Sequence, residues 1–207
     1  MAYPPLVQQL IQLLSQLPSV GPKTAERYIF YLLEQKPELI EPLAHHLEQL
    51  SQTLTTCSEC GAITLSSPCP ICRDPQRSAT LLCVVATNQD LEAIETTGSY
   101  PGRYFVLGGY LDTLNGIKPT DLRLETLLQY LQKNKDIKEI ILAFNPTIEG
   151  ETTALYIQKL LKGKWPGRIS RLARGLATGT NLEYTDPLTL ANALKYRDNS
   201  SGWIING

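Results

Sequence analysis

Four cysteines form the group of residues best suited to chemistry in this sequence. They occur as two Cys-x-x-Cys pairs, Cys57-Ser-Glu-Cys60 and Cys69-Pro-Ile-Cys72, with eight residues between the pairs. Each pair can place two thiolates on one side of a tight turn, and a short hairpin over residues 61–68 can bring the pairs face to face. Four sulfurs at about 2.3 Å from one ion complete the tetrahedral shell of Zn²⁺. The spacing therefore predicts one zinc ion per chain.

A shell of four cysteines leaves no open coordination position for water or substrate, so the predicted zinc is structural and not catalytic. Two disulfides are the alternative, and they require an oxidising compartment. The first residues lack the basic region and apolar core of a signal peptide. We therefore expect a cytoplasmic protein with reduced thiols. Cys83, in the apolar run 81–85, is expected to be a small buried side chain of a strand.

The composition is that of a soluble globular protein. The chain has 207 residues, of which 43% are hydrophobic, and a formal net charge of -1. This length suits one sizeable core or two small domains. No apolar stretch is long enough to cross a bilayer, so no membrane partner is expected. Because no global positive field exists, any binding of nucleic acid must come from a local patch.

One such patch is a basic run near the C-terminal part of the chain. Between positions 159 and 174 the sequence has six basic and no acidic residues: Lys159, Lys162, Lys164, Arg168, Arg171 and Arg174. Two interpretations remain open for this run. It is either a solvated helix end and strand edge, or a face that contacts phosphates or a partner protein.

The first 53 residues have helical periodicity. Leucines at positions 6, 10, 13, 14 and 17 give residues 6–17 one apolar face. The run 18–22 contains two prolines and a glycine, and it predicts a turn with Pro22 in the first turn of the next helix. Further helices are expected over 23–35 and 42–53.

After residue 79 the pattern changes to strands that alternate with helices. Strands are expected over 80–86, 104–107, 137–143 and 168–173, and helices over 88–96, 120–133, 151–161 and 188–196. This alternation predicts an α/β fold with a mostly parallel sheet covered on both faces. In such a sheet the functional crevice lies at the carboxyl ends of the strands.

The turn between the first two helices could bind phosphate. The segment from Leu17 to Arg27 resembles a helix-hairpin-helix DNA-binding motif, although Ser19 stands where the motif commonly has its first glycine. A tight turn at Gly21 exposes backbone N–H groups at a helix start, where the dipole also favours a phosphate. Lys23 and Arg27 share one helix face and can contact the DNA backbone independently of sequence. An ordinary packing corner between helices is the alternative.

The order of these motifs resembles the RecR family of bacterial recombination proteins. The resemblance rests on the hairpin and the four cysteines, followed by Cys83-Val-Val and Asn145-Pro-Thr-Ile-Glu-Gly-Glu151. It extends through residues 102–109, 114–117, 171–175, 182–184 and 188–190, and so covers positions 6 to about 197. It implies a helix-hairpin-helix module (1–53), a four-cysteine zinc finger with its linker (54–79), a Toprim domain (80–175) and a C-terminal segment for oligomerisation (176–207).

Catalytic Toprim proteins hold magnesium with a glutamate after the first strand and an Asp-x-Asp pair after a later one. Here the corresponding positions are Ala86 and Asn145-Pro146-Thr147, and only Glu149 and Glu151 lie nearby. We therefore expect no catalytic residue and no enzymatic activity. The alternative is a metal-dependent Toprim nuclease or primase-like enzyme that recruits magnesium through these two glutamates.

The resemblance also implies a function and partners. RecR proteins are mediators that bind double-stranded and gapped DNA, act with RecO and RecF, and help the RecA recombinase replace single-strand binding protein. They assemble as dimers or ring-like tetramers. Glu149 and Glu151 could present an acidic surface to RecO, or could simply favour the start of a helix. A third possibility is a zinc-stabilised interaction protein without affinity for DNA.

Overall fold

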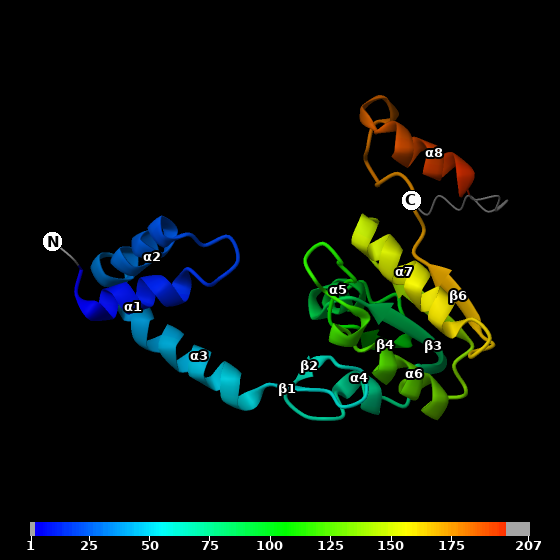
Figure 1. The fold of residues 1–207 in the computed structure, drawn as a ribbon, viewed down its shortest axis with the longest axis horizontal. Coiled ribbons are helices and arrows are strands. Elements are labelled where there is room, and N and C mark those ends of the chain that lie inside the picture. The colour runs from blue at the N-terminus through cyan, green and yellow to red at the C-terminus, as the bar shows by residue number, and fades with distance from the viewer. Residues whose placement is uncertain (1–2, 198–207) are drawn as a thin grey trace, which may run out of the picture. The chain divides into compact units, whose positions relative to one another are not determined.

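The computed structural model describes residues 3–197 of the chain. It divides into two compact units, Met1–Leu54 and Thr55–Gly207. Figure 1 shows the elements of both units, coloured along the chain. The cysteine segment lies in the second unit together with the sheet.

The first unit is helical and contains α1 (Pro5–Leu14), α2 (Pro22–Glu34), the 3-10 turn η1 (Pro37–Leu39) and α3 (Ile40–Thr53). The three helices predicted from the sequence are confirmed. The first of them ends at Leu14 and not at residue 17, because the residue before Pro18 is disfavoured in helical conformation. Ser19 in the connecting turn has a φ of 65°, which explains why the related motif commonly has glycine there.

The core of the first unit is small. Ala25 and Ile29 of α2 are its buried apolar residues, and the rings of Tyr3 and Phe30 pack at 5.2 Å between centroids. Many large apolar side chains of this unit remain exposed. Those on α1 and α3, and on the residues that follow these helices, are Leu6, Leu10, Leu13, Leu17, Ile40, Leu43, Leu47, Leu50 and Leu54.

The second unit is built on a four-stranded sheet of β3 (Ser78–Val85), β4 (Gly102–Val106), β5 (Glu139–Ala143) and β6 (Arg168–Arg171). The strand order is β4-β3-β5-β6, and every pair is parallel. This confirms the α/β fold and the parallel sheet. The helices that follow the strands are α5 (Asn88–Glu95), α6 (Leu124–Lys133) and α7 (Ile148–Leu161), and the 3-10 turn η2 (Pro119–Asp121) precedes α6.

The two faces of the sheet pack against different partners. Leu82 and Val84 of β3 join a core with residues of α6 and α7. The alternate residues Cys83 and Val85 join a second core, which contains Leu91 of α5 and three of the four metal-site cysteines. Successive residues of a strand point to opposite faces, so β3 divides its side chains between the two cores. Cys83 is the buried strand residue that the sequence predicted.

The remaining elements are short. The cysteine segment forms the antiparallel pair β1 (Thr55–Thr56) and β2 (Ile63–Thr64), followed by α4 (Pro70–Arg73). The C-terminal part has a 3-10 turn, η3 (Leu182–Tyr184), and α8 (Pro187–Lys195), where a helix was expected. No helix in the described range is long and apolar enough to cross a membrane.

Gly150 supports a stability prediction, because it lies buried in the first turn of α7. A Cβ atom there would lie 2.1 Å from the backbone oxygen of Asn145. We expect Gly150→Ala to lower the free energy of unfolding by about 1–3 kcal/mol, despite the higher helix propensity of alanine. Urea unfolding followed by near-ultraviolet circular dichroism measures this change.

Gly175→Ala is the matched control, since its Cβ would meet no atom within 4 Å. Its stability should stay within about 0.5 kcal/mol of the parent. Equal stability of both variants would contradict the close approach of Asn145 to α7.

Candidate metal centre and nucleic-acid interface

The four cysteines converge on one point. Their Sγ atoms all lie within 4.8 Å of one another. The Cys57 and Cys72 sulfurs are 3.9 Å apart, and those of Cys60 and Cys69 are 3.6 Å apart. A tetrahedron with metal–sulfur bonds of about 2.3 Å has edges of about 3.8 Å. The arrangement therefore fits a single tetrahedral ion of the zinc type, and the predicted ligands are brought together.

Without an ion, the surroundings of the cluster lower the pKa of Cys60 but raise those of Cys69 and Cys72. Hydrogen bonds lower the pKa of Cys60 to about 6, chiefly through the Cys72 thiol and also through the Ala62 N–H. Burial is the main reason that the pKa of Cys69 is raised to about 11, and hydrogen bonding with Cys60 raises that of Cys72. A bound cation is what allows all four sulfurs to lose their protons.

The cysteine loop is attached to the sheet at β4. The Val106 N–H donates to the Cys60 carbonyl at 2.7 Å, and the Arg123 guanidinium donates to the Val106 carbonyl at 3.0 Å. That guanidinium also lies 4.7 Å above the Phe105 ring. At Gly61, where φ is +82°, a Cβ would overlap the Arg123 side chain. The left-handed φ favours glycine, and the missing Cβ leaves room for Arg123.

Arg123 adds positive charge beside the sulfurs. Burial lowers its pKa, while the neighbouring Cys60 and Cys57 favour its charged form. Four thiolates around a divalent ion have a net charge of -2, which a half-buried arginine partly offsets. Nothing in the sequence points to this residue, because a lone arginine before a helix carries no recognisable pattern.

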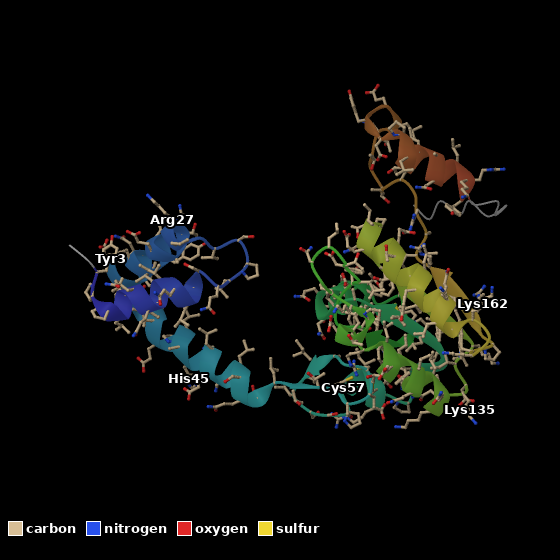
Figure 2. The ribbon with its side chains drawn as sticks, viewed as in Figure 1. Tyr3, Arg27, His45, Cys57, Lys135 and Lys162 are labelled. Atoms are coloured by element: carbon tan, nitrogen blue, oxygen red, sulfur yellow. The ribbon has the colours of Figure 1, made fainter. Side chains whose placement is uncertain are left out.

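The hairpin places the predicted DNA-binding residues at the surface. Gly21 is the N-cap residue of α2, so no side chain accepts a hydrogen bond from the first amides of the helix. Lys23 and Arg27 are exposed and lie one helical turn apart. Figure 2 shows the side chain of Arg27 on the outside of α2. Among the described residues, the N–H groups of Lys23 and Thr24 have no acceptor. Free amides and Lys23 thus meet at the helix start, with Arg27 one turn further along.

The carboxyl edge of the sheet lacks the carboxylates of a magnesium site. Ala86 after β3 is fully buried, and the Asn145 N–H donates to the Tyr110 hydroxyl. Thr147 caps α7 by accepting a hydrogen bond from the Gly150 N–H. Within residues 3–197, the cysteine cluster is the one group of three or more potential metal ligands found together.

The two glutamates of the predicted acidic surface have different environments. Glu151 forms ion pairs with Arg171 and Arg174, and these arginines, Arg171 first, lower its pKa. Glu149 has no ion pair with any described residue. Two members of the basic run are therefore bound within the protein, and a third, Arg168, pairs with Glu139.

Known protein families match the helical unit, the sheet and the C-terminal part of this chain in the same order. Family models for the RecR helix-hairpin-helix, the Toprim domain and the RecR C-terminal region match residues 7–51, 80–173 and 175–197. Proteins named Recombination protein RecR from Staphylococcus saprophyticus, Staphylococcus haemolyticus and Staphylococcus aureus (strain Newman) are each 42% identical over 197 residues. The matches cover 95% of this chain and 98% of each relative.

Fold and site together define a Toprim protein with a helix-hairpin-helix module and a four-cysteine metal centre. At this identity over nearly the full length, the chain belongs to the RecR family of recombination proteins. The resemblance inferred from the motifs is thereby confirmed.

The cysteine geometry predicts the metal content. Native mass spectrometry of the purified protein should find about one zinc ion per chain. Cys60→Ser should lose the ion together with much of the thermal stability, since metal binding is coupled to folding. Cys83→Ser, which changes a cysteine outside the cluster, should keep the zinc. Disulfides among residues 57–72 in freshly isolated protein would contradict the prediction.

The arginine pairs of Glu151 predict a pH-dependent contribution to stability. Because its folded pKa is lowered, the ionised carboxylate stabilises the protein above the ordinary glutamate pKa of about 4.3. Glu151→Gln should cost about 0.5–1 kcal/mol of unfolding free energy at pH 7. The difference should vanish as the pH falls through the lowered pKa.

Urea unfolding at a series of pH values tests this, with Glu149→Gln as the control that leaves both arginine pairs intact. A cost for Glu151→Gln that stays constant down to pH 2 would refute the electrostatic explanation.

Proposed function

We propose that this protein is a DNA-binding mediator of recombinational repair. It acts with RecO and RecF to help load the RecA recombinase at single-strand gaps, as the family resemblance implies. The likeness to RecR proteins over 95% of the chain supports the recombination role. The observation that carries DNA binding is the exposed start of α2, where Lys23 and backbone amides without an acceptor among residues 3–197 lie one turn before Arg27.

The contact with DNA is electrostatic and independent of sequence. Two cations and the N–H groups at Gly21, Lys23 and Thr24 match the negative oxygens of a phosphate backbone. Nothing in this set reads base edges, which need side chains within a groove. Double-stranded and gapped DNA are therefore suitable ligands.

The hairpin surface of a single chain is too small to bind DNA tightly. The protein therefore acts as a homo-oligomer, either a dimer or a ring-like tetramer. The exposed leucines of α1 and α3 support an assembly through the first unit, because apolar surfaces of this extent mark interaction sites. Leu188 and Leu194 of α8 are exposed as well and suit a second contact. Several copies of the hairpin on one DNA molecule would raise the avidity by orders of magnitude.

The metal centre and the Toprim domain support DNA binding and do not catalyse a reaction in this proposal. The ion is Zn²⁺ and is structural, since four sulfurs close its shell. The protein is cytoplasmic, where its thiols stay reduced. We infer that it is not an enzyme, because Ala86, Asn145 and Thr147 cannot supply the carboxylates that magnesium needs. Glu149 and Glu151 are the proposed contact for RecO, with Glu149 the more available of the two.

Fluorescence anisotropy with gapped duplex DNA tests the role of the hairpin. Lys23→Ala with Arg27→Ala should weaken binding about tenfold or more and lower the salt slope by about two per bound hairpin. Lys118→Ala with Lys138→Ala removes the same charge from exposed sites of the second unit and should bind almost as the parent does. Unchanged affinity and salt slope in the first variant would refute the proposed interface.

A further inference from the structure

A pocket unrelated to the metal centre or the hairpin lies at the amino-terminal edge of the sheet. It has a volume of about 820 Å³. Ile137 and Pro166 of its lining come two residues before β5 and β6 begin, and the rest comes from the ends of α6 and α7 and the loops after them. The carboxyl edge, where Toprim proteins have their functional site, is at the opposite ends of these strands.

The floor of this pocket is apolar and fixed in position. Leu131, Ile137 and Leu161 are buried core residues, and Trp165 is half-buried beside them. The indole of Trp165 lies against Gly167, where any Cβ would overlap it. The backbone N–H of Trp165 donates a hydrogen bond to the Leu161 carbonyl at 3.1 Å. The pocket therefore exists before any ligand binds, which reduces the entropic cost of binding.

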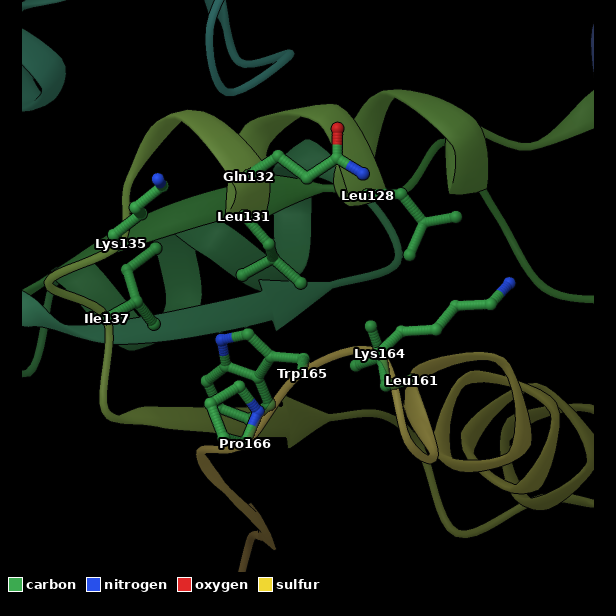
Figure 3. A pocket seen from close by; sticks show the side chains of 9 residues that line it. All are labelled: Leu128, Leu131, Gln132, Lys135, Ile137, Leu161, Lys164, Trp165 and Pro166. Atoms are coloured by element: carbon green, nitrogen blue, oxygen red, sulfur yellow. The ribbon is translucent and has the colours of Figure 1, made fainter.

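Two lysines flank the floor. Figure 3 shows Trp165 opposite Leu131, with Lys135 at one end of the pocket and Lys164 reaching toward Leu128 at the other. Both lysines are exposed, and neither has an ion pair within residues 3–197. Lys133 and Lys159 lie in the last helical turns, where cations offset the helix dipole. Lys135 and Lys164 lie beyond those turns, one at each end of the pocket.

We propose that this pocket binds a short acidic and apolar segment of a partner protein. One or two large aliphatic side chains would cover Leu131, Ile137 and Trp165, while carboxylates on either side would meet Lys135 and Lys164. Both kinds of contact are needed, since the apolar floor supplies affinity and the separated charges select orientation and partner. DNA fits less well, because the buried leucines and isoleucine of the floor offer no hydrogen-bond donor to phosphates.

Trp165 supplies the readout for a direct test. The sequence has two tryptophans, Trp165 and Trp203, so Trp203→Phe leaves Trp165 as the single emitter. The full-length protein in this background is titrated with acetyl-Glu-Asp-Leu-Leu-Asp-Glu-amide at physiological salt. We expect a saturable change in Trp165 emission. The peptides with serine for both leucines, and with lysine for all four acids, should produce none.

Charge variants locate the site. Lys135→Glu with Lys164→Glu should weaken the affinity for the acidic peptide, measured by Trp165 emission, roughly tenfold or more. Lys159→Glu with Lys162→Glu changes the net charge equally, at exposed residues outside the lining, and should weaken it much less. Because no DNA is present, failure here is distinct from failure of the DNA-binding proposal.

The proposal is overturned by any of four results: no saturable response up to millimolar peptide, equal weakening in both double variants, an equal response to a control peptide, or tighter binding of an oligonucleotide at the same site.

Discussion

The edge strand of the sheet is completed by the cysteine loop, and the second unit depends on this contact. The outward N–H and C=O groups of Val106 are bound by the Cys60 carbonyl and by Arg123. An open sheet edge is otherwise prone to pair with other chains. Cys57, Cys60 and Cys69 also share a buried core with Cys83, Val85 and Tyr104. An ion bound by these four sulfurs would therefore stabilise one face of the sheet itself.

The sheet edge that holds magnesium in catalytic Toprim proteins has different residues here. The position of a catalytic glutamate is the buried Ala86, and the threonine after Pro146 caps a helix. Glu151, which the sequence offered as an acidic contact, is largely neutralised by Arg171 and Arg174. The arrangement presents exposed cations at the hairpin, exposed leucines on α1 and α3, and two lysines beside the pocket at the amino-terminal edge of the sheet.

Much of this could be predicted from sequence, for identifiable reasons. Two Cys-x-x-Cys pairs at this spacing bring four sulfurs to one point. The apolar runs of β3 and β5 are typical of strands buried on both faces. Side-chain pairings between distant segments could not be predicted. Nothing in the sequence shows that Glu151 meets Arg171, or that Arg123 fits against Gly61, because these contacts depend on how the strands and helices pack. Ser19 was an apparent departure from the hairpin motif, yet it adopts the left-handed conformation that the turn needs.

Hydrogen exchange by mass spectrometry, comparing the zinc-bound protein with protein stripped by a chelator, is the most direct test of the role of the metal centre. If the cysteine loop completes the sheet, zinc removal will speed exchange in β4 (residues 102–106) as well as in residues 55–73, while the α7 region at 153–161 stays protected. Faster exchange confined to residues 55–73, with β4 unchanged, would show that the metal centre folds independently of the sheet.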